Sequence, residues 1–471
     1  MELFYVERRY GDQMKKQDKQ TVKWTFGYTP EEYRRFRFNG VLYLVLFAVL
    51  YCCLYCMRQN ITYGGQYIAN ELNWSKAEIG ILTSTLFWTY GIGHLINGRL
   101  SEKVGPPKFI VLAVLLSFAA NMLMGAVGFI PNIGDVFGIS GLLLLMAVIW
   151  GFNGYFQSMA WTSGLAVITN WWPSDRRGTA VGFAHAFSGF GAALASLAIV
   201  AAMAISDGAG LNLGFKAVFL LPALIPLLML VVYLIFAKSS PEKIGLSAYV
   251  EEDAAKVEAE NEMKEMVKSR GVLYPYFFLL KNPKFLIFVL VAFLTGVARY
   301  GMTQWVPFYF SEMYNVSVKE SLFGSLALPV GMAVGTLIVP LITDKLCPTN
   351  RMPAVIISAL VAAAAIFGFL PLDPNNAVQL VIIQALLFIA GFGIYAVNGI
   401  AFTYATDIGG RVFSATASGI LDFSVYMGAA IQSIVYGFVF GINATWVFYT
   451  MVIFCALNAA LAIIGSRMKK K

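Results

Sequence analysis

The stretch LVLFAVLYCCLYCMRQNITYGGQY (44–67) indicates the fold class, because it is almost entirely apolar and yet contains Arg58. A helix needs about 20 mostly apolar residues to cross a bilayer, and this run is long enough. A guanidinium stays charged at physiological pH, and placing one at the bilayer centre costs roughly 2.5–3.5 kcal/mol on insertion scales. The stretch therefore predicts a membrane helix whose arginine has a functional role.

A second stretch, FLIFVLVAFLTGVARYGMTQWVPFYF (285–310), has the same character and places Arg299 241 residues after Arg58. Glu102-Lys103 recurs as Asp344-Lys345, and RGTAVGF (177–183) resembles SATASGI (414–420), at similar offsets. Such a parallel repeat, related by an axis along the membrane normal, places a substrate site between the repeats near the midplane. One arginine from each half predicts a single central site for an anion.

The whole composition agrees with a membrane protein. Of 471 residues, 58% are hydrophobic and 13% charged, whereas soluble domains carry about 25% charged residues. The alternating pattern of a membrane β-barrel does not dominate, so we expect an all-α polytopic membrane protein. Twelve apolar runs predict twelve transmembrane helices in two six-helix bundles with pseudo-two-fold symmetry, at 41–68, 77–100, 108–130, 138–170, 178–205, 215–237, 285–311, 320–343, 353–371, 376–405, 413–440 and 445–466.

The predicted division of the chain follows from these runs. We expect a cytoplasmic N-terminal segment (1–40), two bundles (41–237 and 285–466), a charged, partly helical cytoplasmic linker (238–284) and a basic cytoplasmic tail (467–471). Lysines and arginines gather in the loops on the side of the termini, which predicts that both termini are cytoplasmic. The same rule explains the net charge of +8 without nucleic-acid binding.

The segment GRLSEKVG (98–105) resembles the signature of the major facilitator superfamily, G-x-L-x-D-R-x-G, between the second and third spans. The resemblance implies the major facilitator fold and an inner gate. Acidic and basic groups at helix ends can form charge-assisted bonds there. The gating candidates are Gly98, Glu102, Lys103, Asp344 and Lys345. The alternative is an ordinary charged loop.

Within that superfamily, the chain resembles the organophosphate:phosphate antiporters, which include the glycerol-3-phosphate and hexose-phosphate antiporters. The segments that carry the resemblance are YCMRQN (55–60), RYG (299–301) with Trp305, FQSMAW (156–161), Trp171-Trp172 with Arg176-Arg177-Gly178, and Ala184-His185. The resemblance implies that Arg58 and Arg299 bind phosphate and that His185 contacts the substrate. His94 stands where relatives of the glycerol-3-phosphate type carry lysine.

The chemistry of the arginine pair supports an anion site independently. A planar guanidinium presents two N–H groups to two oxygens of one phosphate, which lysine cannot do. The alternative is that each arginine pairs with a buried acid, but Asp422 is the only candidate acid within the spans and cannot neutralise both.

Further candidates for the substrate site are polar and aromatic side chains in the same spans. Tyr51 and Tyr55 precede Arg58 by seven and three residues and so lie near its helix face. Asp422 is a candidate contact for a cationic or hydroxyl-rich part of the substrate. The remaining candidates are Tyr300, Trp161, Gln157, Tyr395, Asn398 and Tyr426. Each of these side chains has the alternative of simple packing.

We predict a secondary transporter, not an enzyme, that exchanges an organic phosphate ester for inorganic phosphate by alternating access. A P-loop, a nucleophile elbow and an H-E-x-x-H motif are lacking, and two histidines make a metal enzyme improbable. We expect no cofactor and no metal, a monomer in the bacterial inner membrane, and as partners a phosphorylated anion, inorganic phosphate and lipid. The alternatives are a proton-coupled or uniport carrier of a sulfonate or carboxylate, and a membrane sensor.

Overall fold

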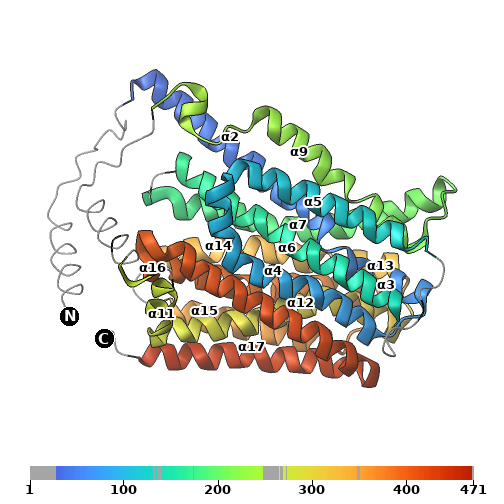
Figure 1. Cartoon of the computed structure of the whole chain (residues 1–471). Coiled ribbons are helices and arrows are strands. Elements are labelled where there is room, and N and C mark those ends of the chain that lie inside the picture. The colour runs from blue at the N-terminus through green and yellow to red at the C-terminus, as the bar shows by residue number, and fades with distance from the viewer. Residues whose placement is uncertain are drawn as a thin grey trace.

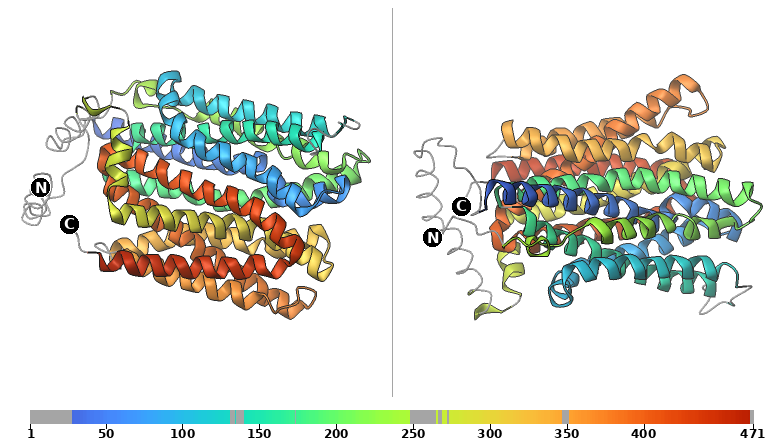
Figure 2. Two further views of the ribbon diagram at one scale, coloured as in Figure 1. Left: turned by 60° about the horizontal axis from the view of Figure 1, so that its bottom comes forward. Right: turned by 90° about the horizontal axis from the view of Figure 1, so that it is seen from above.

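The computed structural model consists of long helices that run roughly along one direction (Figures 1 and 2). It describes residues 28–130, 134, 140–172, 174–247, 265, 269–271, 273–346 and 351–468. Within these ranges, twelve helical segments are long and apolar enough to cross a membrane, as predicted. Helix α17 ends on the side of Figure 1 where α2 begins, as an even number of spans requires.

The first half supplies six spans. The first consists of α2 (Pro30–Leu54), the 3-10 turn η1 (Tyr55–Met57) and α3 (Asn60–Leu72). The next four are α4 (Lys76–Val104), α5 (Pro106–Val127), α6 (Gly141–Trp171) and α7 (Ser174–Gly208). The sixth is made of η2 (Gly214–Lys216), α8 (Ala217–Leu220) and α9 (Leu224–Phe236). Between the halves lie η3 (Pro241–Ile244) and α11 (Tyr274–Leu280).

The second half also supplies six spans. They are formed by α12 (Pro283–Tyr314), α13 (Val318–Ser325) with α14 (Ala327–Leu346), α15 (Met352–Phe369), α16 (Ala377–Ile442) and α17 (Ala444–Arg467). Helix α16 contains two spans, Ala377–Tyr404 and Thr416–Ile442, because helical backbone continues through the connection between them. The sequence predicted a break in this region, at 406–412.

The first span begins earlier than the predicted residue 41. Pro30 occupies the first turn of α2, and Thr29 and Glu32 form a reciprocal capping box, so the helix starts eleven residues before the apolar run. This extension contacts the linker, because Arg35 donates a hydrogen bond of 2.9 Å to the carbonyl of Ile244. Hydropathy alone could not reveal the start, since the extension is polar.

The two halves meet closely at one end and separate at the other. A Cβ at Gly80 of α4 would overlap the carbonyl oxygen of Ser433 in α16, and one at Gly189 of α7 would overlap the backbone of α14. Small residues permit such close helix contacts in membranes. At the opposite end, Gly98, Gly182 and Gly419 have no neighbouring atoms within 4 Å of a Cβ position. The halves are therefore packed tightly on the side of the α3–α4 turn and open on the other side.

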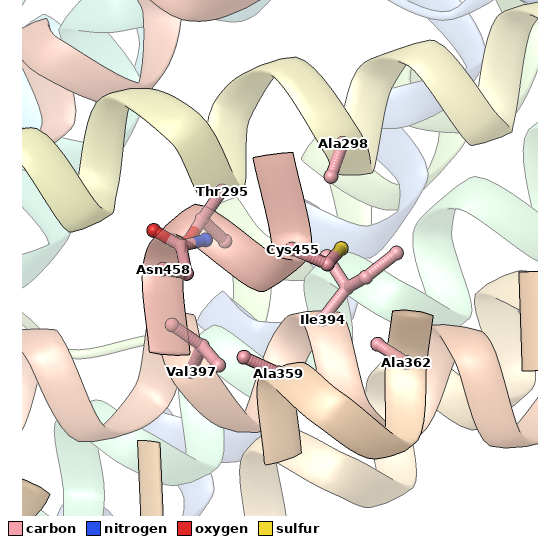
Figure 3. Close-up of a pocket in the computed structure, with 8 residues that line it drawn as sticks. All are labelled: Thr295, Ala298, Ala359, Ala362, Ile394, Val397, Cys455 and Asn458. Atoms are coloured by element: carbon pink, nitrogen blue, oxygen red, sulfur yellow. The ribbon is translucent and has the colours of Figure 1, made fainter. Parts of the chain in front are cut away.

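A small gap lies inside the second half, where α12, α15, α16 and α17 meet (Figure 3). Asn458 donates a hydrogen bond of 3.2 Å to the hydroxyl of Thr295 beside it. The gap is too narrow to hold a water molecule, so it is a packing defect and not a ligand site. It is lined by Thr295, Ala298, Ala359, Ala362, Ile394, Val397, Cys455 and Asn458.

Candidate functional site

Arg58 lies at a break in the first span. The backbone leaves the helix in the 3-10 turn η1 and resumes as α3 at Asn60. The carbonyl of Met57 accepts hydrogen bonds from Asn121 Nδ2 at 3.1 Å and from Asn153 Nδ2 at 2.8 Å. In a membrane, freed backbone groups must find partners within the protein. Side chains of α5 and α6 therefore hold open the break that presents Arg58.

The guanidinium of Arg58 is surrounded by tyrosines. Arg58 is 2% exposed, and its Nη1 donates a hydrogen bond of 2.6 Å to the hydroxyl of Tyr90. Its Cζ lies 3.9 Å from the ring centroid of Tyr55, 5.3 Å from that of Tyr51 and 5.0 Å from that of Tyr90. Its Nε and Nη2 are buried and have no hydrogen-bond partner in the protein. Two donors of this cation thus stay available for an anion.

Arg299, in α12, reaches the same tyrosine from the other half. It is 6% exposed, and its Nη2 donates a hydrogen bond of 3.2 Å to the hydroxyl of Tyr55. Its Cζ lies 4.3 Å from the ring centroid of Tyr395 and 4.5 Å from that of Tyr300. Arg58 covers the face of the Tyr55 ring while Arg299 binds its hydroxyl, so both cations belong to one site.

No carboxylate of the described residues lies within ion-pair distance of either arginine. Asp422 instead lies at His94, with Oδ2 3.3 Å from Nδ1. Aromatic side chains contact the guanidinium groups but carry no formal negative charge. The two cations are therefore left without counter-ions from the part of the chain that the structure describes.

His185 forms another wall of the site with α16. Its Nε2 lies 3.1 Å from Asn398 Nδ2, and its ring centroid lies 5.4 Å from that of Trp161 and 5.9 Å from that of Tyr395. The hydroxyls of Tyr395 and Ser188 are 2.8 Å apart. This wall joins α7 of the first half to α16 of the second.

The remaining substrate candidates lie in the same network. The rings of Tyr90 and Tyr426 are 4.2 Å apart, and those of Tyr300 and Tyr426 are 5.7 Å apart. Tyr51 lies 4.8 Å from Trp161, measured between ring centroids. Gln157 is buried, and its Nε2 donates a long hydrogen bond of 3.5 Å to the carbonyl of Leu54. The structure thus brings together twelve of the thirteen side chains that the sequence suggested, while Gln157 contacts the backbone beside Tyr55.

Two members of this network were missed in the sequence. Tyr90 accepts the hydrogen bond from Arg58, and Ser188 contacts Tyr395. Tyr90 precedes His94 by four residues and Ser188 follows His185 by three, so each shares a helix face with a candidate. That spacing is the signal that could have identified them.

The gating candidates are described only in part. Gly98 is exposed with open space around it, and Lys103 is exposed. The side chains of Glu102, Asp344 and Lys345 lie outside the described residues. Charge pairing at this gate therefore stays a prediction.

The opposite side is closed by polar contacts between the halves. Lys76 Nζ lies 2.7 Å from Glu312 Oε1, and Gln66 Nε2 donates to the same oxygen at 2.9 Å. Deeper in the seam, Gln304 donates a hydrogen bond of 3.3 Å to the hydroxyl of Thr83. Residues of α3 and α4 thus bind α12 across this entrance.

The profile of the Major Facilitator Superfamily matches residues 47–433. The chain belongs to the Major Facilitator Superfamily. The predicted fold is confirmed, and this superfamily member is a multi-pass integral membrane transporter and not an enzyme. Among the described residues, no group of three or more His, Cys, Asp or Glu side chains could hold a metal ion.

Curated relatives of this superfamily member agree with the finer resemblance. They include a probable hexose phosphate transport protein of Chlamydia pneumoniae, 23% identical over 86% of each chain. The glycerol-3-phosphate transporter of Bacillus subtilis (strain 168) is 24% identical over 81% of this chain and 82% of its own. The hexose-6-phosphate:phosphate antiporter of Escherichia coli (strain K12) is 27% identical over 75% and 77%, respectively.

Solved structures share the fold of this superfamily member. An inward-facing, unoccupied bacterial homologue of the human lysosomal transporter Spinster has a TM-score of 0.68 at 16% identity, covering 94% of this chain and 98% of its own. A D-xylose-proton symporter has a TM-score of 0.64 at 17% identity, covering 90% and 96%. At these identities the likeness supports the fold alone.

Proposed function

We propose that this chain exchanges an organic phosphate ester for inorganic phosphate across the cytoplasmic membrane. The observation that carries the proposal is the position of Arg58 and Arg299 on either side of Tyr55, one from each half and neither with a carboxylate partner among the described residues. Relatives named for hexose phosphate, glycerol-3-phosphate and hexose-6-phosphate:phosphate transport support the same substrate class.

In the proposed site, the phosphoryl group binds both guanidiniums. The free Nε and Nη2 of Arg58 offer adjacent donors, and a guanidinium pairs with two oxygens of one phosphate. Arg299 binds a further oxygen in place of the Tyr55 hydroxyl. The partly exposed His185 and the Ser188–Tyr395 pair contact the rest of the ligand from the opposite wall.

Exchange follows from the charge of this site. Closing it around two uncompensated cations costs several kcal/mol for each ion taken from water. A phosphate monoester carries a charge of about −1.5 to −2 at pH 7, so it offsets both cations. Substrate therefore favours the closed state through its higher affinity for that state. The loaded carrier crosses readily and the empty carrier does so slowly.

We also propose that both termini are cytoplasmic. The positively charged loops on the side where α2 begins and α17 ends support this orientation. The tight side, with Lys76 and Glu312, then faces outward, and the open side near Gly98 faces the cytoplasm. The chain accordingly adopts an inward-facing arrangement. We propose that it acts as a monomer, since each chain supplies both arginines.

Proteoliposomes containing the purified protein test the proposal. Internal phosphate is expected to stimulate uptake of labelled glucose 6-phosphate or glycerol 3-phosphate by at least about tenfold over phosphate-free vesicles. Uptake that ignores internal phosphate but follows an imposed pH gradient would contradict exchange and favour proton coupling. A response to sulfonates or carboxylates, with none to phosphate esters, would instead contradict the substrate class.

A further inference from the structure

Asp422 places a carboxylate inside the proposed anion site, but this carboxylate does not pair with either arginine. The residue is 7% exposed, and its Oδ2 lies 3.3 Å from His94 Nδ1. Arginine is a permanent cation, whereas histidine is one only when it takes up a proton. Asp422 therefore has no permanent counter-charge among the described residues.

The carboxylate lies one helical turn away from the arginine end of the site. Tyr90 accepts the hydrogen bond of Arg58 and packs against Tyr426, with ring centroids 4.2 Å apart and the ring planes tilted by 42°. His94 follows Tyr90 by four residues in α4, and Asp422 precedes Tyr426 by four in α16. Four residues rise about 6 Å along a helix, so the two pairs form successive layers about one helical turn apart. The layers are in contact, since the ring centroids of Tyr90 and His94 are 4.7 Å apart.

The two layers offer opposite chemistry. At the first layer, Arg58 Nε and Nη2 are donors without protein partners. At the second, the carboxylate of Asp422 is an acceptor, and His94 Nε2 is buried without a partner. When His94 Nδ1–H donates to Asp422, Nε2 becomes a second acceptor. The site thus has donors at one end and acceptors at the other.

Charge balance distinguishes between the groups that could fill the second layer. A bound phosphate dianion offsets the two arginines, which leaves Asp422 as one negative charge in excess while His94 is neutral. An uncharged hydroxyl satisfies the acceptors but not this charge. An ammonium group satisfies both. The rings of Tyr90 and Tyr426, whose centroids lie 4.7 and 5.9 Å from that of His94, are aromatic groups close enough to attract a cation as well.

We propose that Asp422, together with Tyr90 and Tyr426, takes an ammonium group of the substrate. The preferred substrate is then a zwitterionic phosphate monoester whose amine lies about one helical turn from its phosphorus. This inference rests on the proposed exchange function and specifies the class of ester that the same site takes.

Competition between matched esters tests the inference. Uptake of labelled phosphate into phosphate-loaded proteoliposomes is inhibited with glucosamine 6-phosphate or glucose 6-phosphate, and with 2-aminoethyl or 2-hydroxyethyl phosphate. Within each pair, only an amine and a hydroxyl are exchanged. We expect the amino ester to inhibit at a concentration at least about tenfold lower in both pairs.

The variants assign this preference to the carboxylate. The ratio of the inhibitory concentration of the hydroxy ester to that of the amino ester is expected to fall to about 1 in Asp422→Asn. In Asp422→Glu this ratio should stay above about 1. His94→Gln should keep or widen the ratio, because glutamine cannot take up a proton and become a cation that competes with the ammonium group for Asp422. Asp373→Asn is the matched control and should keep the wild-type ratio, since Asp373 lies in the turn before α16 and accepts from the backbone N–H of Asn375.

A wild-type ratio near 1, or a ratio unchanged in Asp422→Asn, would overturn the inference while leaving phosphate exchange in place. If the wild-type protein fails to exchange phosphate, it is the proposed function that fails. The inference is then decided by the thermal stabilisation that each ester of a pair gives the detergent-solubilised protein. The same readout applies to any variant that folds but does not transport.

Discussion

Tyr55 has an unusual position, because one phenol contacts two guanidinium groups. Its ring face lies against Arg58 and its hydroxyl accepts from Arg299. A phosphate oxygen is a stronger acceptor than a phenol for the Arg299 guanidinium, because it carries negative charge and the phenol hydroxyl does not. An arriving anion is therefore expected to displace the hydroxyl from Arg299 and keep the ring against Arg58.

We predict that Arg58→Lys and Arg299→Lys each reduce phosphate exchange by at least about 100-fold. Lysine keeps the charge but loses the planar pair of donors, and hydrogen bonds to charged groups contribute about 1.5–3 kcal/mol each. Exchange in proteoliposomes gives the rate, and size-exclusion chromatography checks folding. Arg37→Lys, at an exposed position, is the control. Near-normal exchange in either site variant would argue against recognition by the guanidinium fork.

The arginines could be predicted from the sequence because a charge in an apolar run is conspicuous. Tyr90 and Ser188 were missed, because a tyrosine or serine in a membrane helix looks the same whether it packs or binds. Their spacing from His94 and His185 was the one signal that pointed to them. The pairing of Asp422 with His94 also required coordinates, since the two residues lie in different halves.

The break in the first span is the most consequential local feature among the elements. The residues 55–59, YCMRQ, contain neither proline nor glycine, so the sequence carries no breaking signal there. The signal lies instead in other helices, in Asn121 of α5 and Asn153 of α6, which bind the Met57 carbonyl. Local pattern therefore predicted one continuous helix at 41–68, whereas tertiary contacts divide it.

We predict that Asn153→Leu lowers the thermal unfolding temperature of the detergent-solubilised protein and weakens exchange. Leucine has a similar size but leaves the break without its 2.8 Å hydrogen bond, and an unsatisfied buried polar group costs about 1–3 kcal/mol. Asn376→Ala, at an exposed helix cap, is the control for exchange. An unchanged unfolding temperature and rate in Asn153→Leu would mean that the Asn121 contact suffices.

The contact of α4 with α16 gives a second prediction about the helices. Gly80→Ala should slow exchange strongly, because its Cβ overlaps the Ser433 carbonyl and overpacking costs about 1–3 kcal/mol. Gly441→Ala is the matched control, since a Cβ there meets no atom within 4 Å. Alanine favours helix more than glycine does, so propensity cannot explain a loss. Equal exchange in both variants would contradict a role for this contact in closure.

The whole molecule is two bundles joined along a seam that has polar contacts at several depths. From the closed side inward these include Lys76 with Glu312, Thr83 with Gln304, and His94 with Asp422. The repeat in the sequence predicted that the halves would face each other. It could not predict which end is closed, because alternating access gives one sequence two arrangements.

Lys76 and Glu312 provide a prediction about the contact between the two bundles. Lys76→Glu and Glu312→Lys should each slow exchange, because like charges then face each other across the 2.7 Å contact. The double variant should recover much of the rate, since the exchange of charges restores the attraction. Rates of all four proteins in proteoliposomes form a double-mutant cycle. A double variant that is no better than the single ones would show that the pair does not act as a unit.

A polar seam also determines what happens when the two bundles part. Apolar faces drawn apart in water would resist opening in proportion to their area, at about 25 cal/mol for each Å² newly wetted. Here hydroxyl, amide, imidazole and charged groups line the contact, so entering water can solvate them as they separate. Each bundle keeps its own hydrophobic interior, so water can enter and leave the passage between the bundles without unfolding either one.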